Sequence, residues 1–365
     1  AQGRFELTLD PITIAGRRRT VPVTISAGGA LRAGRLTFAG EGAGPKGQPV
    51  TLAGEAPLLL DLEALALTVP PGGPLSARID WAGAVEDLLV MLPMNDHLLR
   101  GDLRVGLRLA GTVGDPRLEG GVTLGDAYYE HLLAGTVLSP LEVELVGEGD
   151  RLRVARFEAG AGKGSVTGEG GLELDPARGL PLSLAFEFEQ ARLIARDEMT
   201  ARADGRLDIE GPLDDPSITG RIDVGRVNAQ LRNNLPPDVV ELDVVEAGAD
   251  DPAAGAVEPV SESAADDATA GRLDIDVHAP ERVFVRGLGL DSEWRGRLAI
   301  GGLTMQPTLT GQVESIRGVM IFLGRRFRIV DSEIRFPGGG EIEPEVDLRA
   351  VHEGSEYVVT LTITG

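Results

Sequence analysis

The sequence contains no cysteine, and this absence removes several classes of protein at once. Without a thiol there is no disulfide framework, no thiolate zinc site and no cysteine nucleophile. Long uncharged apolar runs are also missing. The most apolar stretch, residues 56–71, is interrupted by Asp61 and Glu63, so we expect no membrane-spanning helix. The first residues show no basic segment followed by an apolar one, so we expect no signal peptide.

Positive charge is scarce and aromatic side chains are few. The 365 residues hold 35 Lys and Arg against 57 Asp and Glu, which gives a net charge of −22, and 4% are aromatic. A protein that binds nucleic acid needs a basic surface, so we expect no nucleic-acid partner. The hydrophobic share of 42% is too high for a disordered chain. The composition therefore indicates an acidic, folded protein.

What the sequence does have is alternation of apolar and polar residues with a period of two. Residues 103–109, reading LRVGLRL, set apolar side chains against Arg104 and Arg108, and six similar runs follow further along the chain. Such alternation is typical of strands with one apolar and one solvated face. At five to six residues per strand, we expect roughly 25 strands. Helical patterns are thin, and residues 58–67 and 85–99 are the two candidates.

A short motif with proline and glycine occurs three times. Pro116, Pro216 and Pro307 are each followed two residues later by an aliphatic residue and four residues later by glycine. The spacing between the motifs is too long for an ordinary short solenoid repeat. We therefore expect a turn at each proline and a glycine that gives the backbone freedom as the next strand begins.

An acidic stretch of low complexity divides the chain. Residues 246–271 contain 7 acidic residues, no basic residue and no aromatic residue. Such a composition predicts a disordered insert or linker. We expect a β-rich segment over residues 1–245, the insert over residues 246–271, and a second β-rich segment over residues 272–365 whose strands continue the first.

So many one-sided strands need a cover for their apolar faces. The open alternatives are two large sandwiches, a filled β-solenoid, or one long sheet curled over an apolar interior. We favour the last, an all-β fold with little helix in which an elongated, curled sheet forms an open β-groove. If about 25 strands stack at about 4.8 Å each, the array is on the order of 120 Å long.

Catalytic and metal-binding patterns are weak. The 4 histidines are scattered, without the spacing of a metal site. The string GAGPKG at residues 42–47 precedes a strand rather than a helix, and GKGS at residues 162–165 resembles a phosphate loop only superficially. Asp214 and Asp215 fit an acidic turn better than a calcium site. We expect no enzyme activity, no cofactor and no metal. Two basic groups, residues 17–19 and residues 325–326, are compatible with contacts to lipid phosphates, although solvated strand ends are the simpler interpretation.

Residues 279–296, APERVFVRGLGLDSEWRG, carry the most information. They resemble the "vfvrG-x-Gld-x-E-x-x-G" stretch of the TamB family, the large subunit of the translocation and assembly module. This family lies within the AsmA-like, bridge-like lipid transfer proteins. The segments IRG at residues 316–318, LGRRF at residues 323–327, SEIRF at residues 332–336 and PEVDL at residues 344–348 follow in the family's order. The resemblance is strong over residues 279–348 and weaker back to about Leu99.

The resemblance implies a taco-like β-sheet in the periplasm of a Gram-negative bacterium. The full-length protein would be anchored in the inner membrane and would reach an outer-membrane barrel partner of the TamA type. Two parts of the family are not seen here, the N-terminal anchor and the extreme C-terminal segment. The chain is therefore expected to be a fragment whose membrane contacts lie outside it. The family carries no catalytic residues.

Our leading hypothesis is a periplasmic groove that conducts phospholipids between the inner and outer membranes and supports outer-membrane biogenesis. Acyl chains would lie against apolar side chains, with the head groups in water. The alternative is a chaperone or scaffold that assembles outer-membrane barrel proteins by strand pairing. A filled structural stalk is a third possibility. The residues expected to line the groove collectively are Leu107, Val143, Phe186, Ile209, Ile275, Val285, Ile329 and Ile363.

Overall fold

The computed structural model describes residues 2–9, 12–13, 20–21, 24–43, 49–61, 66–86, 96–231, 271–340 and 342–365. In these residues the chain is almost entirely β-strand, joined by short turns and by η1 (Pro176–Arg178), a 3₁₀ helix. Alternation of side chains along the strands is visible in their burial. In the strand His97–Gly111, half-buried residues alternate with exposed ones over most of its length. The all-β expectation is confirmed.

The described part of the chain contains 23 strands, close to the 25 expected. In chain order they are β1 (Gln2–Leu9), β2 (Ile12–Thr13), β3 (Thr20–Val21), β4 (Thr24–Arg32), β5 (Arg35–Ala43), β6 (Pro49–Pro57), β7 (Leu59–Asp61), β8 (Ala66–Thr68), β9 (Ser76–Ala84), β10 (His97–Gly111), β11 (Pro116–His131), β12 (Thr136–Gly149), β13 (Arg151–Ala161), β14 (Gly164–Glu173), β15 (Leu182–Ala195), β16 (Met199–Gly211), β17 (Ser217–Gln230), β18 (Arg272–Gly287), β19 (Leu290–Leu303), β20 (Gln306–Phe322), β21 (Arg325–Pro337), β22 (Glu345–Glu353) and β23 (Val358–Thr364).

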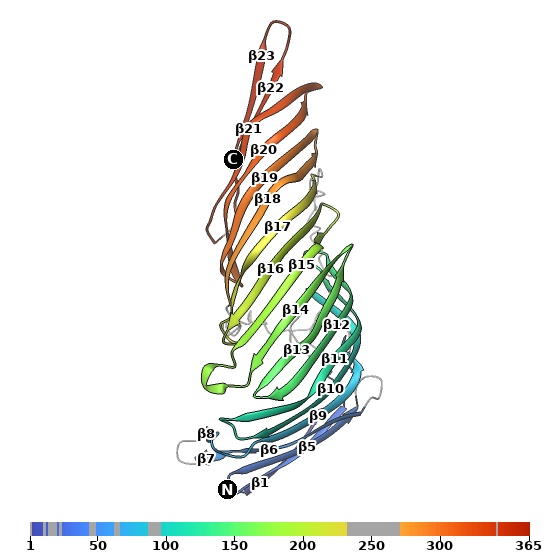
Figure 1. The fold of residues 1–365 in the computed structure, drawn as a ribbon, viewed down its shortest axis with the longest axis vertical. Coiled ribbons are helices and arrows are strands. Elements are labelled where there is room, and N and C mark those ends of the chain that lie inside the picture. Colours follow the sequence, from blue (N-terminus) through green and yellow to red (C-terminus); the bar gives the residue numbers. More distant parts are fainter. Residues whose placement is uncertain are drawn as a thin grey trace, which may run out of the picture.

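One sheet takes up 19 of these strands. Its paired neighbours run β1, β4, β5, β6, β9 and then β10 to β23 in sequence order. Figure 1 shows these strands stacked along the long axis of a curled sheet, with β1 at one end and β22 and β23 at the other. At about 4.8 Å per strand the stack is about 90 Å long, shorter than the 120 Å expected.

One join between neighbouring strands is parallel. Ser217 of β17 pairs with Arg272 of β18, and Gln230 pairs with Arg286, in the same direction. A tight hairpin cannot link parallel neighbours, so the chain has to return from the end of β17 to the start of β18. That connection, residues 232–270, lies outside the described residues, and so does nearly all of the predicted acidic insert. The sheet itself is continuous across the join.

The repeated proline motif marks the starts of strands, as expected. Pro116, Pro216 and Pro307 lie at or beside the first residues of β11, β17 and β20. The motif's glycines include Gly120 with φ +99° and Gly311 with φ +122°. A Cβ atom at these two positions would lie 2.0 and 2.2 Å from a carbonyl oxygen of the preceding strand. Glycine is therefore required both by the backbone conformation and by the close approach of the neighbouring strand.

The expectation of a helical turn is wrong for the first candidate, whereas the second candidate has a helical residue at Glu86. Leu59–Asp61 and Ala66–Thr68 pair with each other as β7 and β8, instead of forming a helical turn over residues 58–67. In the second candidate, residues 87–95 lie outside the described residues, and residues 97–99 already belong to β10. Short apolar runs do not distinguish a helix from a strand by periodicity, and here pairing between neighbours decides.

Several buried hydrophobic residues pack together in one small cluster. It lies where β12 and β15 meet beyond the short β13–β14 hairpin, a contact that we call the β12–β15 seam. The Thr136 hydroxyl donates to the Leu193 carbonyl, and the Ala195 N–H donates to the Ala134 carbonyl at 3.1 Å. Small side chains permit this close approach. The buried residues of the cluster are Ala127, Leu141, Ala159, Ala161, Val166 and Ala191.

Candidate functional site

One face of the sheet is apolar from strand to strand, and pairing shows its continuity. Leu103 pairs with Leu124, Leu124 with Val143, and Val143 with Phe157. The Phe157 ring meets the Phe186 ring edge-on, with 5.2 Å between centroids. The apolar face therefore runs without a break from β10 to β15.

The same face continues across the parallel join. Phe186 pairs with Leu207, Leu207 with Gly220, and Gly220 with Ile275 of β18. In the next row, Ile209 pairs with Ile218. Apolar side chains of β17 and β18 therefore face the same side, even though the connection between these strands is long.

Two contacts carry the face to the C-terminal strands. Val285 pairs with Ser292, and a Cβ atom built on Gly318 would lie 2.7 Å from both Ser292 and Ile329. Ile329 pairs with Ala350, and Ala350 pairs with Leu361. Because residues two apart share a face, Ile363 lies on this side as well.

All eight side chains predicted to line a groove therefore lie on one face of one sheet, although their burial differs. Ile329 and Ile275 are buried, with 4% and 8% of their surface exposed, whereas Ile363 on the edge strand β23 is 46% exposed. The other five are half-buried, namely Leu107, Val143, Phe186, Ile209 and Val285. Their contact with lipid stays a prediction.

The apolar face is lined rather than packed. In the part of the chain that the structure describes, no large hydrophobic side chain is less than 2% exposed. The core of a sandwich or of a filled solenoid would bury its central Leu, Ile and Phe side chains completely. Apart from the small cluster at the β12–β15 seam and single buried residues such as Ile275, Trp294 and Ile329, the face presents half-buried apolar side chains. Such a face can accept an apolar ligand without first expelling a core.

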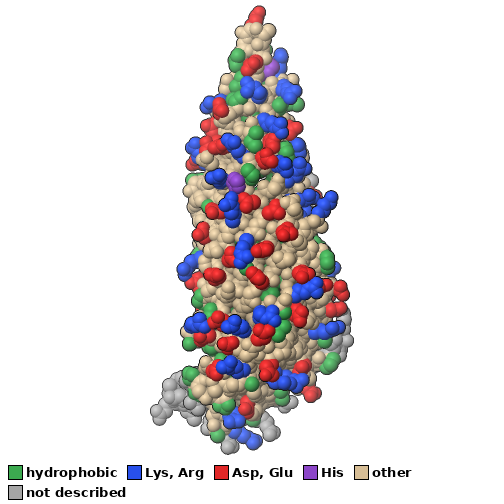
Figure 2. Space-filling model, in the orientation of Figure 1, with side chains coloured by type: hydrophobic (Ala, Val, Ile, Leu, Met, Phe, Trp, Pro, Cys, Tyr) green, Lys and Arg blue, Asp and Glu red, His purple; other side chains and the backbone are tan. Residues whose placement is uncertain are grey.

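The opposite face carries ion pairs at short spacing. Arg206 of β16 contacts Asp208 two residues along the same strand and Glu187 on β15, both at 2.9 Å. Arg335 and Glu333 of β21 repeat the pattern at 2.7 Å. Figure 2 shows Arg and acidic side chains interspersed along the whole visible face. These charges keep one side of the sheet solvated, while the other side is apolar.

Arginine neighbours lower the pKa of carboxyl groups on this charged face and in the connection between β14 and β15. The hydrogen bond from Arg335 is the main cause that lowers the pKa of Glu333, and the hydrogen bond from Arg178 does the same for Asp175. On the apolar side, burial raises the pKa of Tyr129, whose hydroxyl lies 2.8 Å from Nδ1 of His97.

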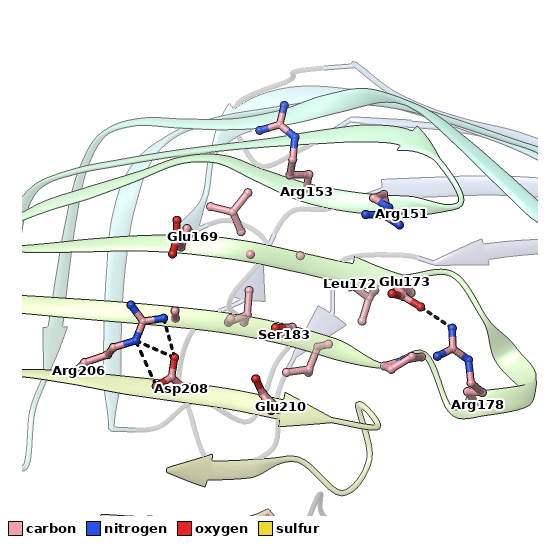
Figure 3. Close-up of a pocket in the computed structure, with 17 residues that line it drawn as sticks. Arg151, Arg153, Glu169, Leu172, Glu173, Arg178, Ser183, Arg206, Asp208 and Glu210 are labelled. Carbon is pink, nitrogen blue, oxygen red and sulfur yellow. Dashed lines mark hydrogen bonds and ion pairs between the residues drawn. The ribbon is translucent and has the colours of Figure 1, made fainter. Parts of the chain in front are cut away.

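A shallow depression of about 650 Å³ opens across β13 to β16, and no pattern in the sequence indicated it. Figure 3 shows charged side chains around it, among them Arg153, Glu169 and Arg206. Its middle is hollow because Gly171, Ser183 and their neighbours carry small side chains. The arginines on its rim already pair with carboxylates, as Arg206 does with Asp208, so the depression offers no unpaired arginine to an anionic ligand.

The motif that carries the family resemblance forms the hairpin of β18 and β19, and its polar residues have structural partners. Glu293 is 9% exposed and accepts hydrogen bonds from Arg317 Nε at 2.7 Å and from the Arg282 N–H at 3.3 Å. The Ser292 hydroxyl accepts from Trp294 Nε1 at 2.8 Å and donates to the Val285 carbonyl at 3.2 Å. These bonds hold the hairpin together.

The remaining candidates from the sequence occupy ordinary positions. His97 and His131 stack with 4.9 Å between ring centroids, while His278 and His352 lie on other strands. Asp215 lies in the turn before β17 and forms an ion pair with Arg272. Residues 162–163 form the β13–β14 turn, with no helix after them. Among the described residues, no three metal-ligating side chains lie together.

Comparison with known proteins identifies the family. No described helix has the length and apolar character needed to cross a membrane. No curated protein and no solved structure matches the chain. The family model described as the TamB C-terminal domain matches residues 155–365, which is more than half of the chain. The match begins later than Leu99, from which the sequence resemblance was expected to extend. Together with the curled sheet and its apolar face, this match establishes that the chain belongs to the TamB family.

Proposed function

We propose that this chain forms part of a periplasmic groove through which phospholipids move between the inner and outer membranes. The observation that carries the proposal is the apolar face, which is continuous from β10 to β23 and has no large side chain completely buried in the described residues. The TamB family, which acts in transport and assembly at the outer membrane, supports the same role. The chain acts as a conduit and not as an enzyme.

The physical basis of transport is the burial of acyl chains against the apolar face, which favours no particular position along the sheet. Each acyl methylene that leaves water contributes about 0.8 kcal/mol, so a lipid with two chains is held firmly. Apolar burial has no preferred orientation, so successive rows of Val, Leu and Ile offer similar sites along the sheet. A lipid can therefore slide between them, while its head group remains in water at the open side.

The remainder of the system lies outside this chain. We propose that the full-length protein is anchored in the inner membrane and that its far end meets an outer-membrane barrel of the TamA type. This arrangement would extend the apolar face across the periplasm. It requires neither cofactor nor metal, and the energy source would lie elsewhere.

A matched pair of substitutions tests the conduit. Val122 and Thr123 are neighbours on β11, half-buried on the apolar face and exposed on the charged face, respectively. Val122→Asp sets a carboxylate among acyl chains, where its charge is costly. We expect at least tenfold less phospholipid to co-purify, measured by native mass spectrometry and lipid extraction. Ile209→Asp should act alike, and Thr123→Asp should retain the lipid.

Circular dichroism establishes that each variant is folded before lipid is counted. Lipid that is absent from the unsubstituted chain, or equally abundant in Val122→Asp and Thr123→Asp, would contradict the conduit. Failure of outer-membrane lipid supply in cells that carry Val122→Asp, but not Thr123→Asp, is the expected physiological result.

One observation favours the second candidate, assembly of barrel proteins by strand pairing. β23 is an edge strand of 7 residues without a charge, and it pairs with β22 on one side only in the described structure. Edges of this kind accept another strand, and lysines block such pairing. Thr360→Lys with Thr362→Lys should reduce co-purification with a TamA-type barrel and leave bound lipid unchanged. If neither quantity changes, the strand-pairing candidate is wrong.

A further inference from the structure

Exposed apolar side chains gather at one rim of the sheet, at its C-terminal end. They belong to the turns β18–β19, β20–β21 and β22–β23, which lie on the same rim because the hairpins alternate between the two rims. We call this set the rim cluster. Its members are Leu323, Leu288, Ile321, Tyr357 and Phe322, with exposed fractions of 87%, 62%, 60%, 51% and 45%.

The rim cluster is contiguous. The Ile321 N–H donates to the Gly289 carbonyl at 2.8 Å, which sets the first two turns side by side. A row of rings leads onward: Phe322 lies 6.5 Å from Phe327, Phe327 lies 5.5 Å from His352, and His352 lies 6.3 Å from Tyr357. A contiguous exposed patch of large apolar side chains marks an interaction surface.

Two of its leucines also break the local rules of folding. Leu288 has φ +53° and Leu323 has φ +49°, and each precedes a glycine that also has positive φ. Two-residue hairpin turns of this kind favour Asn or Asp followed by Gly, because these side chains tolerate the left-handed region. A leucine there adds backbone strain and exposes an apolar side chain. Neither the backbone strain nor the exposed apolar side chain stabilises the fold. Both therefore indicate that these leucines have a functional role.

The charges around the rim cluster are mainly positive. Arg325 and Arg326 follow the turn residues Leu323 and Gly324, and neither forms an ion pair within the described residues. Arg286 is held by Asp291 at 3.1 Å, and Glu356 is the acidic residue beside Tyr357. On a protein with a net charge of −22, two adjacent unpaired arginines beside an apolar tip are unusual. Apolar side chains flanked by arginine match the boundary between acyl chains and phosphates.

We propose that the rim cluster docks this end of the sheet onto an anionic lipid bilayer. The leucine tips enter the acyl boundary, and Arg325 and Arg326 contact lipid phosphates. Phe322 and the rings of Phe327 and His352 lie at the rim end of the apolar face, by alternation from Gly318, Ile329 and Ala350, so the rim cluster adjoins that face. Leu288 and Leu323 lie in turns beyond the strand ends, and substitutions there test the docking apart from the conduit.

Vesicle flotation of the 365-residue chain tests the docking. The probe is a mixture of phosphatidylethanolamine and phosphatidylglycerol, and phosphatidylcholine vesicles are the neutral comparison. Leu323→Asn and Leu288→Asn should each weaken binding at least tenfold, because one leucine's burial exceeds the free energy of a tenfold change. Their melting temperatures should hold or rise, since Asn-Gly suits the turn. Arg325→Gln should weaken binding about fivefold on anionic vesicles only.

Two controls separate the rim from other lipid contacts. Met305→Asn changes an equally exposed side chain in the β19–β20 turn of the opposite rim and should leave flotation unchanged. Val122→Asp impairs the apolar face and should also leave flotation unchanged. The proposal is overturned if the unsubstituted chain does not float with the vesicles. This includes the outcome in which the rim cluster binds a protein but not the vesicles. It is equally overturned if Met305→Asn or Val122→Asp weakens flotation as much as Leu323→Asn does.

Discussion

At the scale of single residues, neighbouring strands approach closely where one of them has a glycine, because glycine has no side chain. At Gly120 a carbonyl oxygen of β10 occupies the space that a Cβ would need, and the backbone has a φ that side chains disfavour. A methyl group added to Gly125 on the same strand would have no neighbour within 4 Å. The structure therefore requires glycine at one of these two positions of β11 and not at the other, and the composition alone does not distinguish them.

This contrast gives a prediction on stability. Gly120→Ala should lower the free energy of unfolding by roughly 3 kcal/mol, because the strands must separate or the backbone must strain. Gly125→Ala should be neutral or stabilise slightly, since alanine restricts the unfolded chain. Urea unfolding followed by circular dichroism measures both. Equal destabilisation by the two substitutions would show that the close approach at Gly120 is unimportant.

At the scale of elements, several strands, among them β9, β13, β16, β17 and β21, carry on their charged face an ion pair between an arginine and a carboxylate two residues apart. Such pairs are solvent-exposed, so each contributes little, and salt weakens them. Their effect is collective, because many charged side chains together keep this face of the sheet solvated. The lowered pKa of Glu333 reflects this pairing, and the lowered pKa of Asp175 reflects the corresponding contact with Arg178 at η1.

The pH dependence of stability follows from the direction of these shifts. A carboxyl whose pKa is lower in the folded chain contributes its stability above the unfolded pKa, about 4, and loses it as pH falls through the folded value. The melting temperature should therefore be level from neutral pH to about 5 and should fall below about 4. Added salt should flatten the fall, and Arg335→Gln should reduce it. A melting temperature that rises on acidification would contradict this account.

Elements also show where sequence reasoning succeeds. The alternation in residues 103–109 correctly predicted a strand with an apolar and a charged face, and the proline motifs correctly predicted strand starts. Residues 58–67 were misread because their short apolar run fits either period and pairing between β7 and β8 decides the outcome. The rim cluster was missed for another reason. Leu288 and Leu323 become conspicuous only when their φ values and exposure are known.

At the scale of the whole molecule, 19 of the described strands form one elongated, curled sheet. The sequence was sufficient to predict that the eight side chains share one face, because alternation within each strand determines which residues lie on the same side. The order of strands and the parallel join of β17 to β18 could not be predicted, because no local pattern specifies which distant strand becomes a neighbour. The tight seam between β12 and β15 likewise depends on the short β13–β14 hairpin between them.

The elongated shape has a direct test in solution. A compact protein of 365 residues has a radius of gyration of about 21 Å. A stack of 19 strands about 90 Å long requires a clearly larger value. Small-angle X-ray scattering of the monomer should give a skewed pair-distance distribution with a long tail. A symmetric distribution at the compact radius would exclude the extended sheet.

The parallel join also has a consequence for how the chain folds. Most neighbouring strands after β10 are linked by short turns, so their pairing closes small loops and can proceed as a series of local steps. Pairing of Ser217 with Arg272 closes a loop about ten times longer, which costs roughly 2 kcal/mol more in chain entropy. The strands before and after the join can therefore assemble separately, and their union is the slow, non-local event. During synthesis, the exposed edge of β17 has to wait unpaired until β18 emerges.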